Sequence, residues 1–174
     1  MTQKILIGLG LVMIVGCALT VALVQRLTNT DRVNIVVRQI ADFDLPQGYQ
    51  TDYAVDVLGY TIAAYKSDDG NGHLVFMQAP PGVIPDEQAV AGYVANERTT
   101  TTWSNEMLVL TDERSVRDHL APLTISDRTN GEGQRYRSLN LVFQGREGTV
   151  LLVINQPVAQ WDEAVVEAFI ASIH

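Results

Sequence analysis

The hydrophobic and polar positions divide this chain into two parts with different patterns. The stretch from Ile5 to Val24 holds no charged residue, and it is flanked by Lys4 on one side and Arg26 on the other. A helix of that length rises roughly 30 Å, which matches the hydrocarbon core of a bilayer, and a helix satisfies its own backbone hydrogen bonds there. The pattern therefore predicts a membrane anchor within residues 1–26.

Three interpretations of this apolar run stay open. A permanent single-pass helix fits its length, whereas a cleaved secretory signal has a shorter apolar region and a small-residue cleavage site. The sequence Ile14-Val15-Gly16-Cys17 resembles a bacterial lipobox, which would make Cys17 a lipidated N-terminus. Residues 18–24, however, are apolar where lipoproteins usually have a polar tether. The spanning helix and the lipoprotein both place the rest of the chain at a membrane surface.

The charges around the run give opposing indications of its orientation. Lys4 and the N-terminal amine favour an inside N-terminus, while Arg26, Arg32 and Arg38 pull the other way under the positive-inside rule. A short charged start before an apolar run is the usual export signal. We therefore expect a protein of the cell membrane with an extracytoplasmic globular domain.

Residues 27–42 are expected to be a connector, in which Val33–Val37 fits either a helix or the start of a strand. From Phe43 onward, short segments rich in β-branched, aromatic and alternating residues predict strands. Asn71-Gly72 lies between two of them and is a strong hairpin signal. The predicted strands are Tyr60–Lys66, His73–Gln78, Met107–Thr111, Ser115–Leu120, Leu123–Ser126, Arg135–Gln144 and Thr149–Ile154.

Two amphipathic segments predict helices. Pro85-Asp86-Glu87 begins the first, whose apolar face carries Val90, Tyr93 and Val94. The second, at the C-terminus, has Trp161, Val165, Phe169 and Ile173 at i, i+4 spacing. Short hairpin links make the sheet mainly antiparallel. The prediction is an α+β domain over residues 43–174, with about six strands, one helix midway and one C-terminal helix packed on the sheet.

The charge and the cysteine content narrow the partners and the chemistry. The net charge is −8 and the pI is near 4.7, which argues against nucleic acid because Lys and Arg dominate binding to phosphates. The sole cysteine, Cys17, lies in the apolar run, so residues 43–174 have neither a disulfide nor a thiolate site.

The candidates for catalysis or metal binding are isolated. The histidines are His73, His119 and His174, and their spacing matches no metal motif. Asp118 and Ser115 precede His119, but neighbouring residues on a strand face opposite ways, so Asp118 is not expected to orient His119. The acidic loop 67–72 lacks the EF-hand spacing for calcium. We therefore assign no catalytic, cofactor-binding or metal residue and expect no cofactor.

Arginines and acids alternate between residues 112 and 137 in a way that predicts a solvated surface with ion pairs rather than an anion-binding face. The arginines are Arg114, Arg117, Arg128, Arg135 and Arg137, and the interleaved acids are Asp112, Glu113, Asp118, Asp127 and Glu132.

Two stretches of the sequence resemble the ends of PsbP-like α/β sandwich domains. They are the opening Phe43-Asp44-Leu45-Pro46-Gln47-Gly48-Tyr49 and the closing Trp161 with Phe169-Ile170-Ala171-Ser172-Ile173, and the order of elements between them is similar. The resemblance covers roughly residues 43–173. It implies a fold, and it implies an accessory or binding protein rather than a particular activity. We carry over no functional residue.

These observations support two hypotheses of function. The first is a membrane-tethered accessory domain without catalytic activity, which binds a protein partner or a small ligand. The second is a membrane-anchored hydrolase whose site is assembled from residues distant in sequence. A catalytic site would show converging ionisable groups with perturbed pKa values, whereas a binding domain would show an apolar groove or an exposed aromatic patch involving Tyr49, Tyr53 or Trp103.

Overall fold

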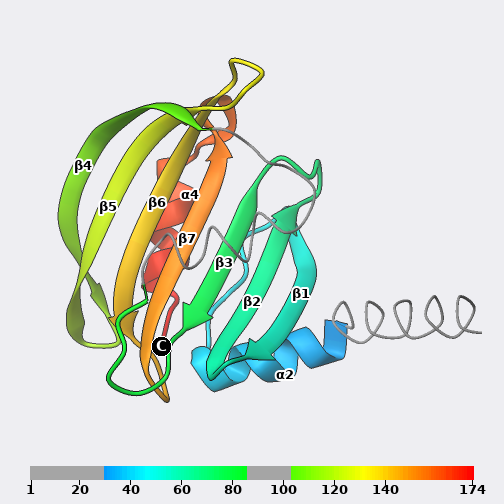
Figure 1. The fold of residues 1–174 in the computed structure, drawn as a ribbon, viewed down its shortest axis with the longest axis vertical. Helices are drawn as coiled ribbons and strands as arrows, with labels where there is room; N and C mark the ends of the chain where they lie inside the picture. The colour runs from blue at the N-terminus through cyan, green and yellow to red at the C-terminus, as the bar shows by residue number, and fades with distance from the viewer. Residues whose placement is uncertain (1–29, 86–102) are drawn as a thin grey trace, which may run out of the picture.

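The computed structural model describes residues 30–85 and 103–174, which form a seven-stranded antiparallel sheet with helices on one side (Figure 1). Consecutive strands pair as two meanders, β1-β2-β3 and β4-β5-β6-β7, and β3 joins β7 in the middle of the sheet. The elements in chain order are α2 (Thr30–Ile40), β1 (Tyr49–Val57), β2 (Tyr60–Ser67), β3 (His73–Gln78), β4 (Ser104–Val116), β5 (His119–Thr129), β6 (Arg135–Gln144), β7 (Thr149–Pro157), the 3-10 turn η1 (Val158–Gln160) and α4 (Glu163–Ala171).

The α+β class and the mainly antiparallel sheet are confirmed, but the prediction of about six strands is one too few. The sequence did not reveal β1, because Asp52 and Asp56 interrupt its apolar pattern and a register shift between Thr51 and Tyr53 changes its phase. The predicted strand Ser115–Leu120 is wrong. Arg117 and Asp118 form a turn there with φ of 49° and 63°, which separates β4 from β5.

The first described helix, α2, belongs to the hydrophobic core, although it was expected to lie in a connector. Val33, Val36, Val37 and Ile40 recur at helical spacing and are all buried against the sheet. Asp31 lies in its first turn and Arg38 in its last, where each charge complements the helix dipole. The packed unit therefore includes residues 30–40 as well as the described residues from Phe43 onward.

The predicted C-terminal helix is observed as α4, but it is shorter than predicted, since Trp161 precedes it and Ile173 follows it. The carboxylate of Asp162 caps it by accepting hydrogen bonds from the backbone N–H groups of Ala164 and Val165, at 3.0 and 3.2 Å. Phe169 is buried, as predicted, and its ring packs edge-on against Phe43 with centroids 5.6 Å apart. Val165, expected on the apolar face, is 45% exposed, because the buried face is formed by Val166, Phe169 and Ile170.

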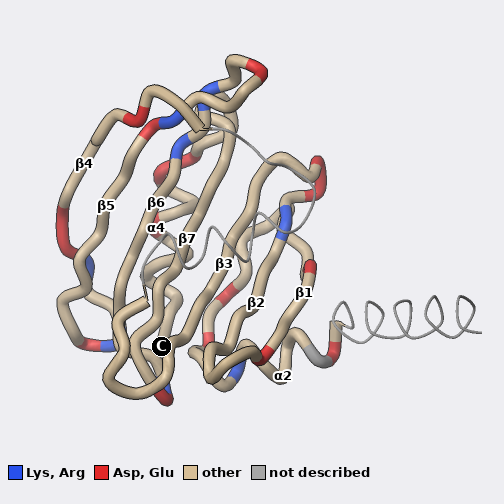
Figure 2. The backbone as a smooth tube through the Cα atoms, in the orientation of Figure 1, with Lys and Arg blue, Asp and Glu red and all other residues tan. Residues whose placement is uncertain are grey.

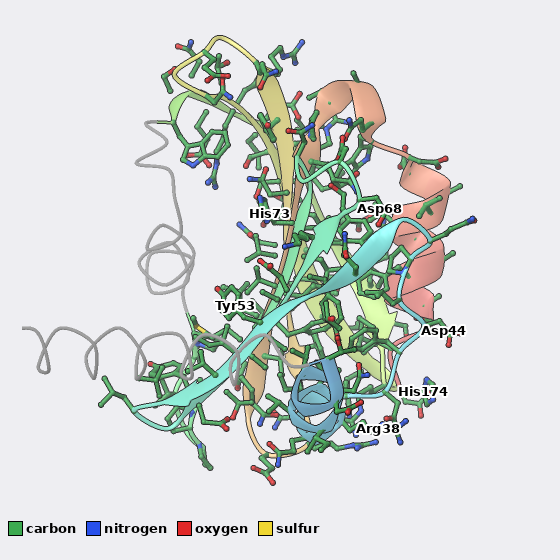
Figure 3. The ribbon with its side chains drawn as sticks, turned by 90° about the vertical axis from the view of Figure 1, so that its right-hand side faces the viewer. Arg38, Asp44, Tyr53, Asp68, His73 and His174 are labelled. Carbon is green, nitrogen blue, oxygen red and sulfur yellow. The ribbon has the colours of Figure 1, made fainter. Side chains whose placement is uncertain are left out.

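Both helices lie on one side of the sheet, and Figure 3 shows Tyr53 and His73 on the side that faces away from α4. On that second side, Ile62, Val75, Met77 and Leu151 form a smaller buried cluster. The predicted helix that begins at Pro85 falls on residues 86–102, outside the described residues.

The predicted anchor from Ile5 to Val24 also lies outside the described residues. Among residues 30–85 and 103–174, no helix combines the length and the apolar character that a membrane span requires. Membrane attachment therefore stays a prediction from the sequence.

Candidate functional site

The histidines lie on separate elements: His73 begins β3, His119 begins β5 and His174 ends the chain. His73 is half-buried, and loss of solvent around it lowers the pKa of its imidazole, while the nearby carboxylate of Asp52 partly opposes this. His119 is exposed beside the β4–β5 turn, where Val116 is its cross-strand partner. Within the described residues, no three side chains of His, Cys, Asp or Glu gather as a metal site.

Four of the five predicted arginines, Arg114, Arg128, Arg135 and Arg137, form ion pairs, and one of their partners, Asp127, is buried. Asp127 accepts hydrogen bonds from Arg137 Nε at 2.7 Å and from Arg135 Nη2 at 2.9 Å. The hydrogen bond from Arg137 is the main reason why the pKa of this carboxyl is lowered. The Arg137 guanidinium also lies over the ring of Trp161, 5.7 Å from its centroid. This cluster fastens β5 and β6 to the segment before α4.

A second ion-paired arginine holds the outer strand β4 to α4. Arg114 donates from Nη2 to Glu167 of α4 at 2.9 Å and from Nη1 to Asp112. These hydrogen bonds raise the pKa of the guanidinium, so Arg114 stays charged at every physiological pH. Arg128 pairs with Glu106 at 3.2 Å, while Arg117 donates to the carbonyl oxygen of Gln144 at 3.1 Å. The guanidinium groups of these residues thus bind acceptors of the same domain, so they do not form an anion-binding face.

A cavity between α4 and the sheet is too small for an organic ligand. Its volume is about 10 Å³, which is close to the space of one water molecule. Its walls are mainly apolar and include Tyr49, whose hydroxyl accepts a hydrogen bond from the amide of Gln156. Burial raises the pKa of the Tyr49 hydroxyl. Tyr49 is therefore a packing residue and not part of an exposed aromatic patch.

The feature that stands out on the surface is β4, which forms one edge of the described sheet and, within the part of the chain that the structure describes, pairs only with β5. Three successive large hydrophobic side chains are exposed on it: Met107 at 54%, Leu108 at 64% and Val109 at 43%. Two register shifts, between Ser104 and Met107 and between Leu108 and Leu110, place an extra residue on each side of Leu108. These irregularities explain why the apolar side chains do not all turn toward the core.

An exposed aromatic ring lies just before the start of the same strand, four residues before Met107. Trp103 directly precedes β4, is 37% exposed, and packs edge-on against Tyr136 of β6 with ring centroids 5.4 Å apart. Of the aromatic residues considered for a binding patch, Tyr53 instead packs against the buried cluster on the second side of the sheet. We define the β4 patch as Trp103, Met107, Leu108 and Val109. The sequence indicated Trp103, but it did not reveal the other members.

Comparisons with known proteins bear on the fold. No protein-family model matches the chain, and no curated protein matches it in sequence. The chain is similar to the solution structure of cyanobacterial PsbP (CyanoP) from Synechocystis sp. PCC 6803, at 14% identity and a TM-score of 0.52. The similarity covers 79% of this chain and 87% of that one. The resemblance predicted from the two ends of the domain is thus confirmed at the level of the fold: the chain folds as a PsbP-like domain.

Proposed function

We propose that this protein is a non-catalytic accessory domain, tethered to a membrane, that binds an extended segment of a protein partner along the outer edge of β4. The observation that carries the proposal is the β4 patch, in which Met107, Leu108 and Val109 are exposed together on an edge strand. Isolated exposed hydrophobic residues are ordinary, whereas a contiguous group on a strand edge is typical of an interaction site.

The backbone of an edge strand supplies the affinity for such a partner. Among residues 30–85 and 103–174, no strand pairs with the side of β4 that faces away from β5, so we propose that the N–H and C=O groups on that side bond to a further strand. Recognition of this kind adds a strand to the sheet through main-chain hydrogen bonds, and the side chains supply the specificity. Met107 and Leu108 would contact apolar side chains of the added strand.

Charge gives the partner a second property. Glu106 lies at one end of the apolar run, Asp112 and Glu113 lie at the other, and all three are exposed. The whole chain carries a net charge of −8. We therefore propose a partner segment that is apolar in the middle and basic at its ends, because charges of opposite sign speed encounter and fix the register.

The tether is the other half of the proposal. Residues 5–24 would anchor the chain in a cell membrane, either as a single-pass helix or through a lipid on Cys17, with the domain on the extracytoplasmic side. The PsbP-like fold supports an accessory role, because the resemblance to PsbP-like domains implies an accessory or binding protein. Tethering would raise the effective concentration of the domain near a membrane-bound partner.

The test is site-specific photo-crosslinking of the full-length protein in its native membrane. A photoreactive amino acid at position 108 is compared with one at position 35, because Leu108 and Ile35 are aliphatic residues of nearly equal exposure, 64% and 63%. We expect a discrete protein adduct from position 108 alone. Mass spectrometry should map it to an apolar segment with basic ends.

Substitution then measures the contact. Leu108→Lys should weaken binding of the mapped segment at least about tenfold, through lost apolar contact and repulsion by its basic ends, while Ile35→Lys should not. Equal adducts from positions 108 and 35, or no protein adduct from position 108, would contradict the proposal. An adduct between two copies of this chain would overturn the assignment of a separate partner.

A further inference from the structure

The most exposed large hydrophobic side chains of the described residues lie in a turn, in a loop segment and at the start of strand β5, rather than on the β4 patch. They are Leu58 at 85%, Ile84 at 76% and Leu120 at 72% exposure. Leu58 is in the β1–β2 turn, Ile84 is in the segment after β3, and Leu120 follows the β4–β5 turn. Nothing in the sheet or the helices gains stability from these side chains, since folding leaves them in water.

These segments lie side by side at one end of the sheet, the lower end in Figure 1. A Cβ atom placed on Gly59 would be 3.1 Å from Pro80, which brings the β1–β2 turn against the segment after β3. That segment continues to the β6–β7 turn, because the N–H of Ala79 donates to the carbonyl oxygen of Thr149 at 2.9 Å. Arg117 then reaches Gln144 from the β4–β5 turn at 3.1 Å. We call this group of segments the apolar end.

The choice of leucine at position 58 is a second sign of a role for this end. Leu58 has φ of +53°, in the left-handed region where Gly, Asn and Asp are common and a bulky residue is an outlier. Holding a leucine side chain there is energetically unfavourable. The two-residue turn formed by Leu58 and Gly59 requires positive φ at both positions, so the turn itself explains the backbone conformation. What the turn does not explain is the choice of an exposed leucine at the first position, where Asn, Asp or Gly is favoured.

The opposite end of the sheet has different chemistry. The loops 67–72 and 130–134 are polar, and Figure 2 shows acidic residues at their tips, on the upper side of the molecule. Asp69 accepts hydrogen bonds from Ser67, Asn71 and Gln160, and these hydrogen bonds strongly lower the pKa of its carboxyl. That end therefore stays charged and hydrated, while the apolar end offers aliphatic side chains.

Helix α2 has its C-terminal end at the apolar end, whereas Thr30 at its start lies beside Thr51 of β1. Helix α2 crosses the sheet at its lower end in Figure 1, and the N–H of Arg146 in the β6–β7 turn donates to the carbonyl oxygen of Ile40 at 3.1 Å. Only residues 25–29 separate Thr30 from the predicted anchor, a reach of roughly 20 Å when fully extended. If the anchor is in a bilayer, the bilayer surface lies within this distance of α2.

From these observations we infer that the apolar end rests on the bilayer, with Leu58, Ile84 and Leu120 inserted among the lipid headgroups and upper acyl chains. Charges at this end are mixed, since Arg117 and Arg146 neighbour Asp118 and Glu147, so the contact depends on apolar insertion rather than on anionic lipid. This inference rests on the proposed tether. It also orients the domain, with the sheet strands rising from the membrane.

The test uses the full-length protein in vesicles of phosphatidylcholine, with an environment-sensitive fluorescent amino acid at position 58, 84 or 120. Positions 71 and 132, on the exposed loops of the opposite end, serve as matched controls. At positions 58, 84 and 120 we expect a blue-shifted emission that spin-labelled lipid quenches. At positions 71 and 132 we expect a water-like emission that the lipid does not quench. Water-like emission at all five positions would overturn the inference.

Extraction with alkaline carbonate separates this failure from failure of the tether. Retention of the protein in the vesicles together with water-like emission at positions 58, 84 and 120 would leave the anchor intact and contradict only the docked orientation. Release of the protein into the supernatant would contradict the anchor, and with it both proposals that depend on it.

Discussion

The two edges of the sheet, β1 and β4, meet solvent in different ways. β1 is partly covered by α2, whose Thr30 hydroxyl lies 3.2 Å from that of Thr51, and Ala54 of β1 is fully buried. β4 extends over thirteen residues, and its burial pattern is exposed at all but three of them. Edge strands invite pairing with other chains, and proteins usually protect them with charge, bulges or cover. β1 shows all of these devices, with Asp52 at its register shift.

The difference shows which residues of β4 do not contribute to the stability of the domain. β4 has register shifts and flanking acids, but between them it exposes the hydrophobic residues Met107, Leu108 and Val109. It is held to the domain from the core side, by Val116 and by the Arg114–Glu167 ion pair, and its outer side contributes little to folding. A strand fastened on one side and apolar on the other is suited to receive a partner.

The largest expected effect tests whether α4 belongs to the hydrophobic core. Phe169→Ala removes a buried ring that packs against Phe43 and Phe76 and should cost about 3–5 kcal/mol, with a sharp fall in melting temperature. Val165→Ala on the same helix, where the side chain is 45% exposed, is the matched control and should be nearly neutral. An unchanged melting temperature for Phe169→Ala would contradict the placement of α4 as core.

The second prediction compares the two edges directly. Ile40→Ala in α2, beneath the β1 half, should cost about 2–5 kcal/mol because the side chain is fully buried. Leu108→Ala on β4 should change the free energy of unfolding by no more than about 0.5 kcal/mol, because the side chain is exposed. Urea unfolding of both variants measures the difference, and a large cost at Leu108 would show that β4 supports the fold rather than a partner.

Acid should weaken the β4 side of the sheet through Asp127. Its pKa is lower in the folded domain than in the unfolded chain, so its stabilisation is complete above the ordinary carboxyl pKa and declines as the pH falls below about 4. Asp127→Asn should reduce stability at neutral pH and flatten this part of the pH profile. Thermal melts between pH 2 and 7 provide the test, and identical slopes for the variant and the parent would exclude the ion pairs with Arg135 and Arg137 as the cause.

A smaller pH dependence of stability is expected from His73, on the β1 side of the sheet. Burial lowers the pKa of this imidazole, so the unfolded chain binds a proton more readily and stability should decline as the pH falls below about 6.5. His73→Gln should remove that slope while leaving the acid slope of Asp127. Proton uptake on unfolding, measured by calorimetry in two buffers at pH 6, should fall in the variant, and unchanged uptake would assign the slope to another group.

The sequence pattern predicts a strand or helix well where the structure of that segment depends on residues close in sequence. Arg135–Gln144 was predicted with its observed bounds, and its residues Leu139, Leu141 and Phe143 are buried on one face. The sequence Asn71-Gly72 predicted the hairpin between β2 and β3, although the residue with positive φ in its turn is Gly70. These features depend on neighbours within a few residues, so one sequence contains the information.

Whether a strand lies at the edge or in the centre of the sheet depends on strands that are distant in sequence, so it could not be predicted from the local pattern. Met107–Thr111 was predicted as a strand, but an apolar run of this kind also suits a central strand, and only the pairing with β5 shows that β4 is an edge. The turn at Arg117-Asp118 was not predicted, because both residues have positive φ although neither is glycine. The β4 patch and the apolar end could therefore be found only after the fold was known.

The comparison between the two edges is tested most directly by hydrogen exchange of the backbone amides, measured by mass spectrometry on the membrane-bound protein with its partner present and after the partner has been removed. The account predicts that the partner slows exchange in β4, residues 104–116, and leaves β1, residues 49–57, unchanged, because only β4 gains a neighbouring strand. Unchanged exchange in β4, or equal slowing in both strands, would contradict it.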